Sequence, residues 1–323
     1  MRKRWGQTPT PSIPAIARPR QNFYSFPMLS LESLAALARD HAADLPAQVR
    51  EFSLKGHSFR ASDRPHLMGV VNFSADSWYR ESVVLSTASA VERIHRLRAE
   101  GAHLIDLGAE SSLAHAARAD AETQNRILLP VLRELAPQGL LLSVETYQPA
   151  TARACLEAGA AVLNLTGTRP SDEIYRMVAA HGAGIILCYV QGPNVREVGD
   201  FVRSADHAAA LRDYFQKEIE RAVALGVSAI WIDPGLGFYY RNLQDSADRI
   251  RYQAETFLHT FRLRTLGWPV CHALPHAFEF FGDEVRSAES LFAVLAILGK
   301  TDLLRTHEIP KVRAVARTLG VLS

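Results

Sequence analysis

The stretch Ile232-Asp233-Pro234-Gly235-Leu236-Gly237-Phe238 is the part of the chain on which the prediction of the fold depends. Residues 227–233 are mostly apolar and predict a short strand, which the following Pro-Gly-Leu-Gly ends in a turn. Asp233 therefore places a carboxylate at the exit of a strand, beside glycines that let a ligand approach the backbone. An aspartate here can also simply begin a turn, so its role depends on what ends the other strands.

The other strands follow a regular pattern, because short apolar segments alternate with helical segments from residue 67 to the C-terminus. Strands are expected at residues 67–72, 104–108, 140–144, 161–165, 184–189, 227–233, 269–273 and 302–305. Helices are expected at residues 86–100, 121–135, 149–158, 171–181, 205–225, 243–265, 287–298 and 309–319. Strands that are apolar throughout predict a parallel sheet with a covered outer face. Eight such units favour a closed (β/α)8 TIM barrel, an α/β fold, over an open doubly wound sheet.

The length of 323 residues exceeds the roughly 250 that such a barrel takes and leaves room for an N-terminal extension. Residues 1–28 are basic and rich in proline, and predict a flexible arm. Residues 29–63 predict a helix at 29–49 and a small hairpin at 52–59, which would cap one mouth of the barrel. The barrel itself is expected to span residues 64–323.

Composition excludes several classes of protein. The net charge of +2 argues against a nucleic-acid or membrane partner, and no apolar run approaches the roughly 20 residues that span a bilayer. Cys155, Cys188 and Cys271 are too few and too scattered for a disulfide framework, and none of them has metal-ligand spacing. We therefore expect a cytoplasmic protein in which Cys271, inside an apolar strand, is part of the core.

Polar side chains gather at the predicted strand ends, which converge on one face of a parallel barrel. The residues there are Asn72, Glu110 to Ser112, Glu145, Asn164, 189–192, Asp233, 272–276, Arg305 and His307. Asn72, Arg305 and His307 are donors suited to an anion, and the asparagine oxygen can also bind a metal. The acceptors Glu145, Asn164 and Asp233 suit a neutral heterocycle rich in N–H groups.

These strand ends resemble a known family. Residues 68–78, MGVVNFSADSW, look like the MGILNVTPDSF segment of the dihydropteroate synthases of the pterin-binding barrel superfamily. IDLGAESS at 105–112 is similar to IDIGGEST, and SVET at 143–146 to SVDT. DPGLGF at 233–238 and RTHE at 305–308 resemble DPGxGF and RVHD, and all five matches follow the family's order.

The resemblance implies that an arylamine condenses with a 6-hydroxymethyl-dihydropterin diphosphate and that pyrophosphate is released. This reaction belongs to the biosynthesis of folate or of a methanopterin-type cofactor. Asp233, with Asn164 and Glu145, would then hold the pterin. Ser112 and Phe238 are also expected to bind substrate. Mg²⁺, bound partly through Asn72, would act with Arg305 and His307 on the leaving diphosphate. No protein nucleophile is needed, and the resemblance suggests a homodimer.

Some family residues are replaced. The lysine expected after the seventh strand is missing from Leu274-Pro275-His276-Ala277-Phe278, and the lysine after DPGxGF is Tyr240. The arginine of the second loop is also missing, and Glu145 replaces an aspartate. We hypothesise that His276 takes over as a ring donor, a hypothesis that rests only on its position; a solvated loop histidine is the simpler interpretation.

These replacements leave three readings of the function. The first is a divergent synthase that uses another pterin or another arylamine. The second is a non-catalytic paralogue that binds pterin or phosphate. The third is a pterin-dependent barrel of another kind, such as a methyltetrahydrofolate methyltransferase.

Overall fold

The computed structural model describes residues 29–60, 64–74, 82–84, 86–111, 116–167, 172–238, 240, 242–243 and 245–322. The predicted arm at 1–28 therefore lies outside the described residues. The chain forms two compact units, Met1–Ala42 and Ala43–Ser323. Helix α1, Leu31–Asp40, belongs to the first unit and begins with a capping box in which Ser30 and Ser33 bond each other's backbone N–H groups. This helix is shorter than the predicted 29–49: it ends at Asp40, where His41 has left helical backbone, and Pro46 further disfavours helical backbone at residue 45.

The second unit is a barrel of eight parallel strands, which confirms the predicted fold. The strands are β3 His66–Asn72, β4 Leu104–Gly108, β5 Leu142–Thr146, β6 Val162–Leu165, β7 Gly184–Cys188, β8 Ile230–Asp233, β9 Cys271–Ala273 and β10 Leu303–Thr306. They pair in the order β8-β7-β6-β5-β4-β3-β10-β9. The ring closes between β8 and β9, where Ile232 forms a parallel bridge with Val270 and donates its N–H to the Pro269 carbonyl at 3.1 Å.

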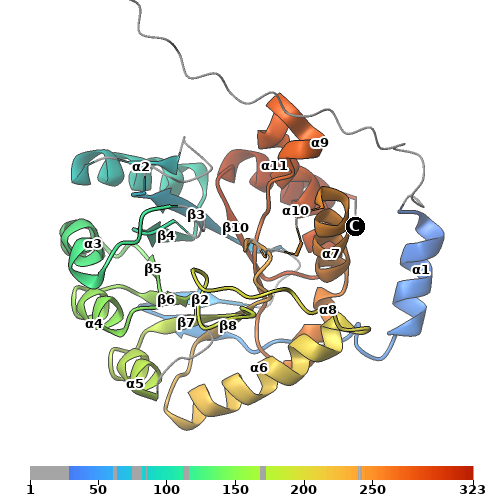
Figure 1. Cartoon of the computed structure of the whole chain (residues 1–323), viewed down its shortest axis with the longest axis horizontal. Coiled ribbons are helices and arrows are strands. Elements are labelled where there is room, and N and C mark those ends of the chain that lie inside the picture. Colours follow the sequence, from blue (N-terminus) through green and yellow to red (C-terminus); the bar gives the residue numbers. More distant parts are fainter. Residues whose placement is uncertain are drawn as a thin grey trace, which may run out of the picture. The chain divides into compact units, whose positions relative to one another are not determined.

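Helices surround this ring of strands (Figure 1). They are α2 Thr87–Glu100, α3 Ala121–Leu135, α4 Pro149–Glu157, α5 Asp172–Ala180, α6 His207–Ala224, α7 Ser246–Leu258, α10 Ala288–Leu298 and α11 Ile309–Leu319. Their apolar faces pack on the outside of the strands, as Tyr175 and Phe215 do beside Ile185 and Ile230. In the described part of the chain, no helix is long and apolar enough to cross a membrane.

The single helix predicted at 243–265 is wrong. The structure divides this segment into α7, the short helix α8 at Thr260–Leu263 and a 3₁₀ turn at Arg264–Leu266. The hydroxyls of Thr256 and Thr260 bond to the carbonyls four residues earlier, at 2.8 and 3.1 Å, and such bonds bend helices. A second unpredicted feature is the helix α9 at Phe278–Phe281, which is too short for a periodic pattern to show.

The predicted hairpin consists of β1 Phe52–Leu54 and β2 His57–Phe59. Its two turn residues, Lys55 and Gly56, both have positive φ, as a tight two-residue hairpin turn requires. Phe52 and Phe59 pack edge-on against Trp231 from the barrel interior, with ring centroids 4.7 and 5.0 Å away. Because Leu54 also lies against the start of β7, the hairpin covers the end of the barrel at which the strands begin. The opposite end is left for a site.

The buried imidazole of His272 makes stability depend on pH. It lies in β9 with no exposed surface, 2.8 Å from the Thr260 hydroxyl, and burial lowers its pKa from 6.5 to about 3. As the pH falls, the imidazole binds a proton in the unfolded chain before it does so in the folded protein. The contribution of the neutral, buried His272 to the free energy of unfolding is therefore present above pH 6.5 and is lost as the pH falls. We expect the stability advantage of the wild type over His272→Gln to shrink by about 2 kcal/mol between about pH 7 and about pH 5. Urea unfolding of both proteins measures this, and an unchanged difference would contradict it.

Candidate active site

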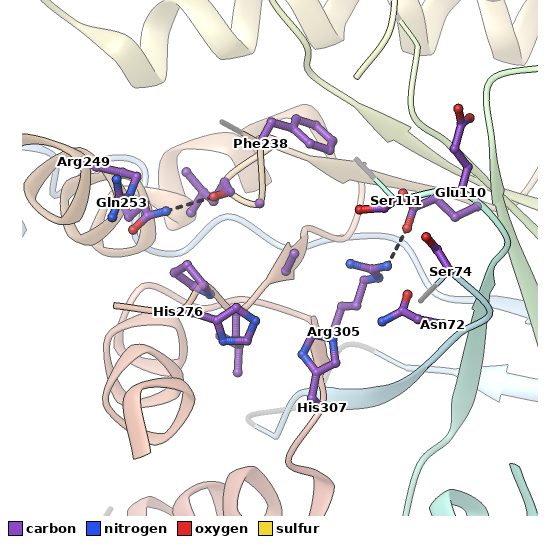
Figure 2. Close-up of a pocket in the computed structure, with 16 residues that line it drawn as sticks. Asn72, Ser74, Glu110, Ser111, Phe238, Arg249, Gln253, His276, Arg305 and His307 are labelled. Atoms are coloured by element: carbon purple, nitrogen blue, oxygen red, sulfur yellow. Dashed lines mark hydrogen bonds and ion pairs between the residues drawn. The ribbon is translucent and has the colours of Figure 1, made fainter. Parts of the chain in front are cut away.

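A cavity of about 110 Å³ lies at the carboxyl ends of the strands (Figure 2). Side chains from the ends of β3, β4, β5, β9 and β10 and from the segment after β8 line it. Of the predicted site residues, those that line the cavity are Asn72, Glu145, Phe238, His276, Arg305 and His307. Ser112 lies outside the described residues. Asn164 on β6 and Asp233 on β8 are buried and do not line the cavity.

Arg305 lies at the centre of the polar groups, as Figure 2 shows. Its Nε donates to Asp106 Oδ2 at 2.8 Å, and its Nη2 donates to Glu145 Oε2. The third nitrogen, Nη1, bonds to none of the residues that the structure describes. The guanidinium is thus held by two carboxylates and keeps one nitrogen for a ligand.

Asp106 is one of two site residues that sequence analysis missed. Its fully buried carboxylate accepts three hydrogen bonds, from Ser143 Oγ at 2.7 Å, Asn164 Nδ2 at 2.9 Å and Arg305. It stands in the middle of β4, whereas the prediction considered only residues at strand ends. A signal was present, because an acidic residue inside an apolar strand is buried and must be paired.

Buried carboxylates outnumber the guanidinium that they surround. Burial raises the pKa of Asp233 to about 6, although the N–H of Gly235 and the charge of Arg305 oppose this. Burial also raises the pKa of Glu145; the charge of Arg305 opposes this rise, and the charge of Asp106 adds to it. Burial alone would lower the pKa of Arg305, but Glu145 and Asp106 raise it above its ordinary value. This group of acceptors suits a ligand that brings N–H donors.

The turn after β8 fixes the position of Asp233. Its Oδ1 accepts the N–H of Gly235 at 2.8 Å, and Gly235 has a φ of 77°. A Cβ at Gly235 would lie 2.1 Å from the Tyr189 carbonyl, so only glycine fits. The ring of Phe238 folds back to 3.1 Å from that Cβ position and lines the cavity.

Asn72 ends β3 with its amide held in one orientation. Nδ2 donates to Ser82 Oγ at 2.7 Å, and Oδ1 lies beside Gly108 at the next strand end. A carbonyl oxygen held at a cavity wall is a ligand that Mg²⁺ accepts, so Asn72 fits the expected magnesium site.

On the other side of Arg305, His276 and His307 lie with ring centroids 5.3 Å apart. His307 Nδ1 is 2.8 Å from Oε1 of Glu289, a fully buried residue of α10 that sequence analysis did not single out. Burial lowers the pKa of His276 to about 4, with the charge of His307 acting in the same direction. His276 is therefore neutral near pH 7 and does not supply the charge of the missing lysine.

Two side chains, Arg196 and Tyr240, join neighbouring loops of the site. Arg196, after β7, donates to the carbonyls of Ser111 and Ala116 at 2.6 Å each. The hydroxyl of Tyr240, which stands where the family has a lysine, accepts the N–H of Gln191 at 3.0 Å. These two side chains join loops that follow different strands.

Comparisons with known proteins agree with this geometry. The sequence profile of a family described as "Pterin binding enzyme" matches residues 68–307. Dihydropteroate synthase type-2 of Escherichia coli is 30% identical over 264 residues, which are 79% of this chain and 95% of that protein. The structure is similar to dihydropteroate synthase of Thermus thermophilus in complex with 4-aminobenzoate, with a TM-score of 0.70 and 25% identity over 85% of this chain and all of the other. The same enzyme in complex with 6HMPPP superposes over the same shares with a TM-score of 0.67 and 25% identity.

Asp106 should be essential for stability. In Asp106→Asn the buried guanidinium of Arg305 loses a charged partner, and we expect a loss of about 3–5 kcal/mol in the free energy of unfolding. Ser143→Ala is the matched control, because it removes one hydrogen bond to the same carboxylate and should cost about 1–3 kcal/mol. Urea unfolding compares the two, and an equal small loss would show that the ion pair adds nothing.

Proposed function

Since the chain belongs to the pterin-binding enzyme family and is a transferase of the dihydropteroate synthase type, we propose that it condenses a 6-hydroxymethyl-dihydropterin diphosphate with an arylamine and releases pyrophosphate. The observation that carries this proposal is the group of buried acceptors around Arg305. Asp106, Glu145 and Asp233 face one guanidinium and leave acceptor capacity for N–H groups.

The pterin binds against β8 and its neighbours in this proposal. Asp233 is buried and does not line the cavity, so the ring has to displace part of the cavity wall to reach it. The carboxylate would then accept two parallel hydrogen bonds, from the ring N3–H and from the 2-amino group, which orients the ring. Asn164 is fixed by its bond to Asp106 and completes the recognition of the ring edge. Phe238 supplies an apolar surface at the mouth of the cavity.

The diphosphate lies toward Asn72, Arg305 and His307. Arg305 offers Nη1, while Glu289 holds the imidazole of His307 through Nδ1. Mg²⁺, held in part by Asn72 Oδ1, would supply positive charge for the leaving group. The arylamine nitrogen forms a bond to the exposed methylene as the C–O bond breaks, and pyrophosphate leaves with the electron pair. The amine proton passes to solvent, so no protein nucleophile takes part.

The second substrate is not expected to be held as in an ordinary folate-pathway synthase. His276 is neutral where the family has a lysine, and Tyr240 is tied to the loop after β7. A Thermus thermophilus relative has been solved in complex with 4-aminobenzoate, which makes that arylamine the first to test. Because the loops that would hold the arylamine are altered, bulkier arylamines are the next to test. The homodimer and the cytoplasmic location stay predictions.

The test is calorimetric titration of the full chain with 6-hydroxymethyl-dihydropterin diphosphate and Mg²⁺, followed by pyrophosphate release over a panel of arylamines. Binding with release would establish the synthase and identify its second substrate. Binding without release would favour the non-catalytic paralogue. Methyl transfer from methyltetrahydrofolate to a corrinoid partner would indicate the third reading, and the absence of all three would refute a pterin function.

Replacing the carboxylate of Asp233 tests the ring contact directly. Asp233→Asn keeps the size of the side chain but removes its charge and one acceptor, so two hydrogen bonds to a charged group are weakened. We expect kcat/KM to fall about a hundredfold, since this corresponds to about 3 kcal/mol. Asp213→Asn on the exposed part of α6 is the control and should match the wild type. Equal kcat/KM values for all three proteins would place the pterin elsewhere.

A further inference from the structure

We propose that His276, Glu289 and His307 form a binding site for a divalent transition-metal ion, of the Zn²⁺ class, in the wall of the cavity. The three side chains come from the segment after β9, from α10 and from the end of β10. One potential ligand atom from each lies within 4.8 Å of the other two. This site is separate from the magnesium expected at Asn72 on the other side of Arg305.

Glu289 is positioned as a ligand. Its Oε2 is held in place by the hydroxyl of Thr306 and by the N–H of His307 at 3.0 Å. Its Oε1 is approached by two imidazoles, with His307 Nδ1 at 2.8 Å and His276 Nδ1 at 3.9 Å. Backbone and hydroxyl donors that fix one oxygen leave the other one to bind an ion, as is common behind metal ligands.

The spacing requires only a small movement. Ligands bound about 2.1 Å from one ion lie about 3–4 Å from each other, so the group must contract by about 1 Å. His276 can provide this movement, because it lies in the segment between β9 and α9, outside any regular element. His307 Nδ1 and Glu289 Oε1 are 2.8 Å apart, slightly closer than that spacing, so these two atoms would separate a little as the ion replaces the proton between them.

The ligand chemistry selects the kind of metal. Two imidazoles and one carboxylate suit Zn²⁺, Co²⁺ or Fe²⁺, whereas Mg²⁺ prefers oxygen ligands and water. Three protein ligands leave coordination positions open, as in catalytic rather than structural sites. His276 and His307 both line the cavity, while Glu289 is buried behind them. The open positions therefore face the cavity.

The role of this ion rests on the proposed function. His307 is one of the residues placed at the diphosphate, so an ion held beside it would add positive charge at the leaving group. His276 would then contribute as a metal ligand in place of the charge of the missing lysine. Binding of the ion can be measured without pterin or turnover, so failure of one proposal does not entail failure of the other.

The experiment uses the full chain after treatment with a chelator, without substrate. Co²⁺ is added and its visible absorption recorded, because its spectrum depends on the ligands; the Zn²⁺ affinity is then measured by competition. The variants are His276→Ala, His307→Ala and Glu289→Gln, the last of which keeps the shape of the buried side chain. Each should lower the Zn²⁺ affinity at least about tenfold. Thermal unfolding checks that each variant is folded.

His57→Ala is the control, because His57 lies on the hairpin at the opposite end of the barrel. The proposal is supported if this variant keeps the wild-type affinity while folded His276→Ala and one of the other two lose it. It is overturned if the wild type binds neither ion. It is also overturned if the variants bind Zn²⁺ as tightly as the wild type, which would place the ion elsewhere.

Discussion

A guanidinium buried at the mouth of a barrel has to be matched by carboxylates, and the arrangement of the site depends on this match at Arg305. Arg305 is paired with Asp106 on β4 and Glu145 on β5, and Asp106 in turn binds Ser143 and Asn164. These two ion pairs and two hydrogen bonds together join four of the eight strands, β10, β4, β5 and β6, near their carboxyl ends. A buried ion pair of this kind adds little stability compared with apolar packing, but losing one partner is costly. The pairing fixes the position of the acceptors more than it strengthens the barrel.

The two ends of the barrel are built differently. Where the strands begin, the hairpin inserts Leu54 and Phe59 among apolar residues and packs on Trp231, so this end is closed. Where the strands end, the interior becomes polar within two residues: on β8, Trp231 belongs to the apolar interior and Asp233, two residues later, is polar. Because alternate residues of a strand point in opposite directions, the same short strands bury an apolar outer layer and present polar groups to the mouth.

The fold could be predicted from the sequence because each strand is a short, mostly apolar segment followed by turn chemistry. The predicted boundaries differ from the structure where side-chain hydrogen bonds compete with the helix, as at Thr256 and Thr260, and where α1 ends before Pro46. The residues at strand ends were found because topology brings them together. Asp106 and Glu289 were not, because one lies inside a strand and the other on a helix, where only three-dimensional contacts reveal that they face Arg305 and His307. The sequence pattern predicts on which face of a strand or helix a residue lies, but not which side chain it contacts there.

The charge of the cavity limits how it can hold an anion. Among its described lining residues, Glu110 and Glu145 balance Arg249 and Arg305. Arg249 is also bound to Glu279, with Nη2 2.8 Å from both carboxylate oxygens, and Asp106 lies directly behind Arg305. His276 is neutral and His307 is paired with the carboxylate of Glu289, so the described residues give the cavity no excess of positive charge. A diphosphate carries several negative charges, and stabilising it as it leaves requires cations within a few ångströms. If this cavity binds such a group, the positive charge has to come with the substrate or from ions held by Asn72 and by the two histidines.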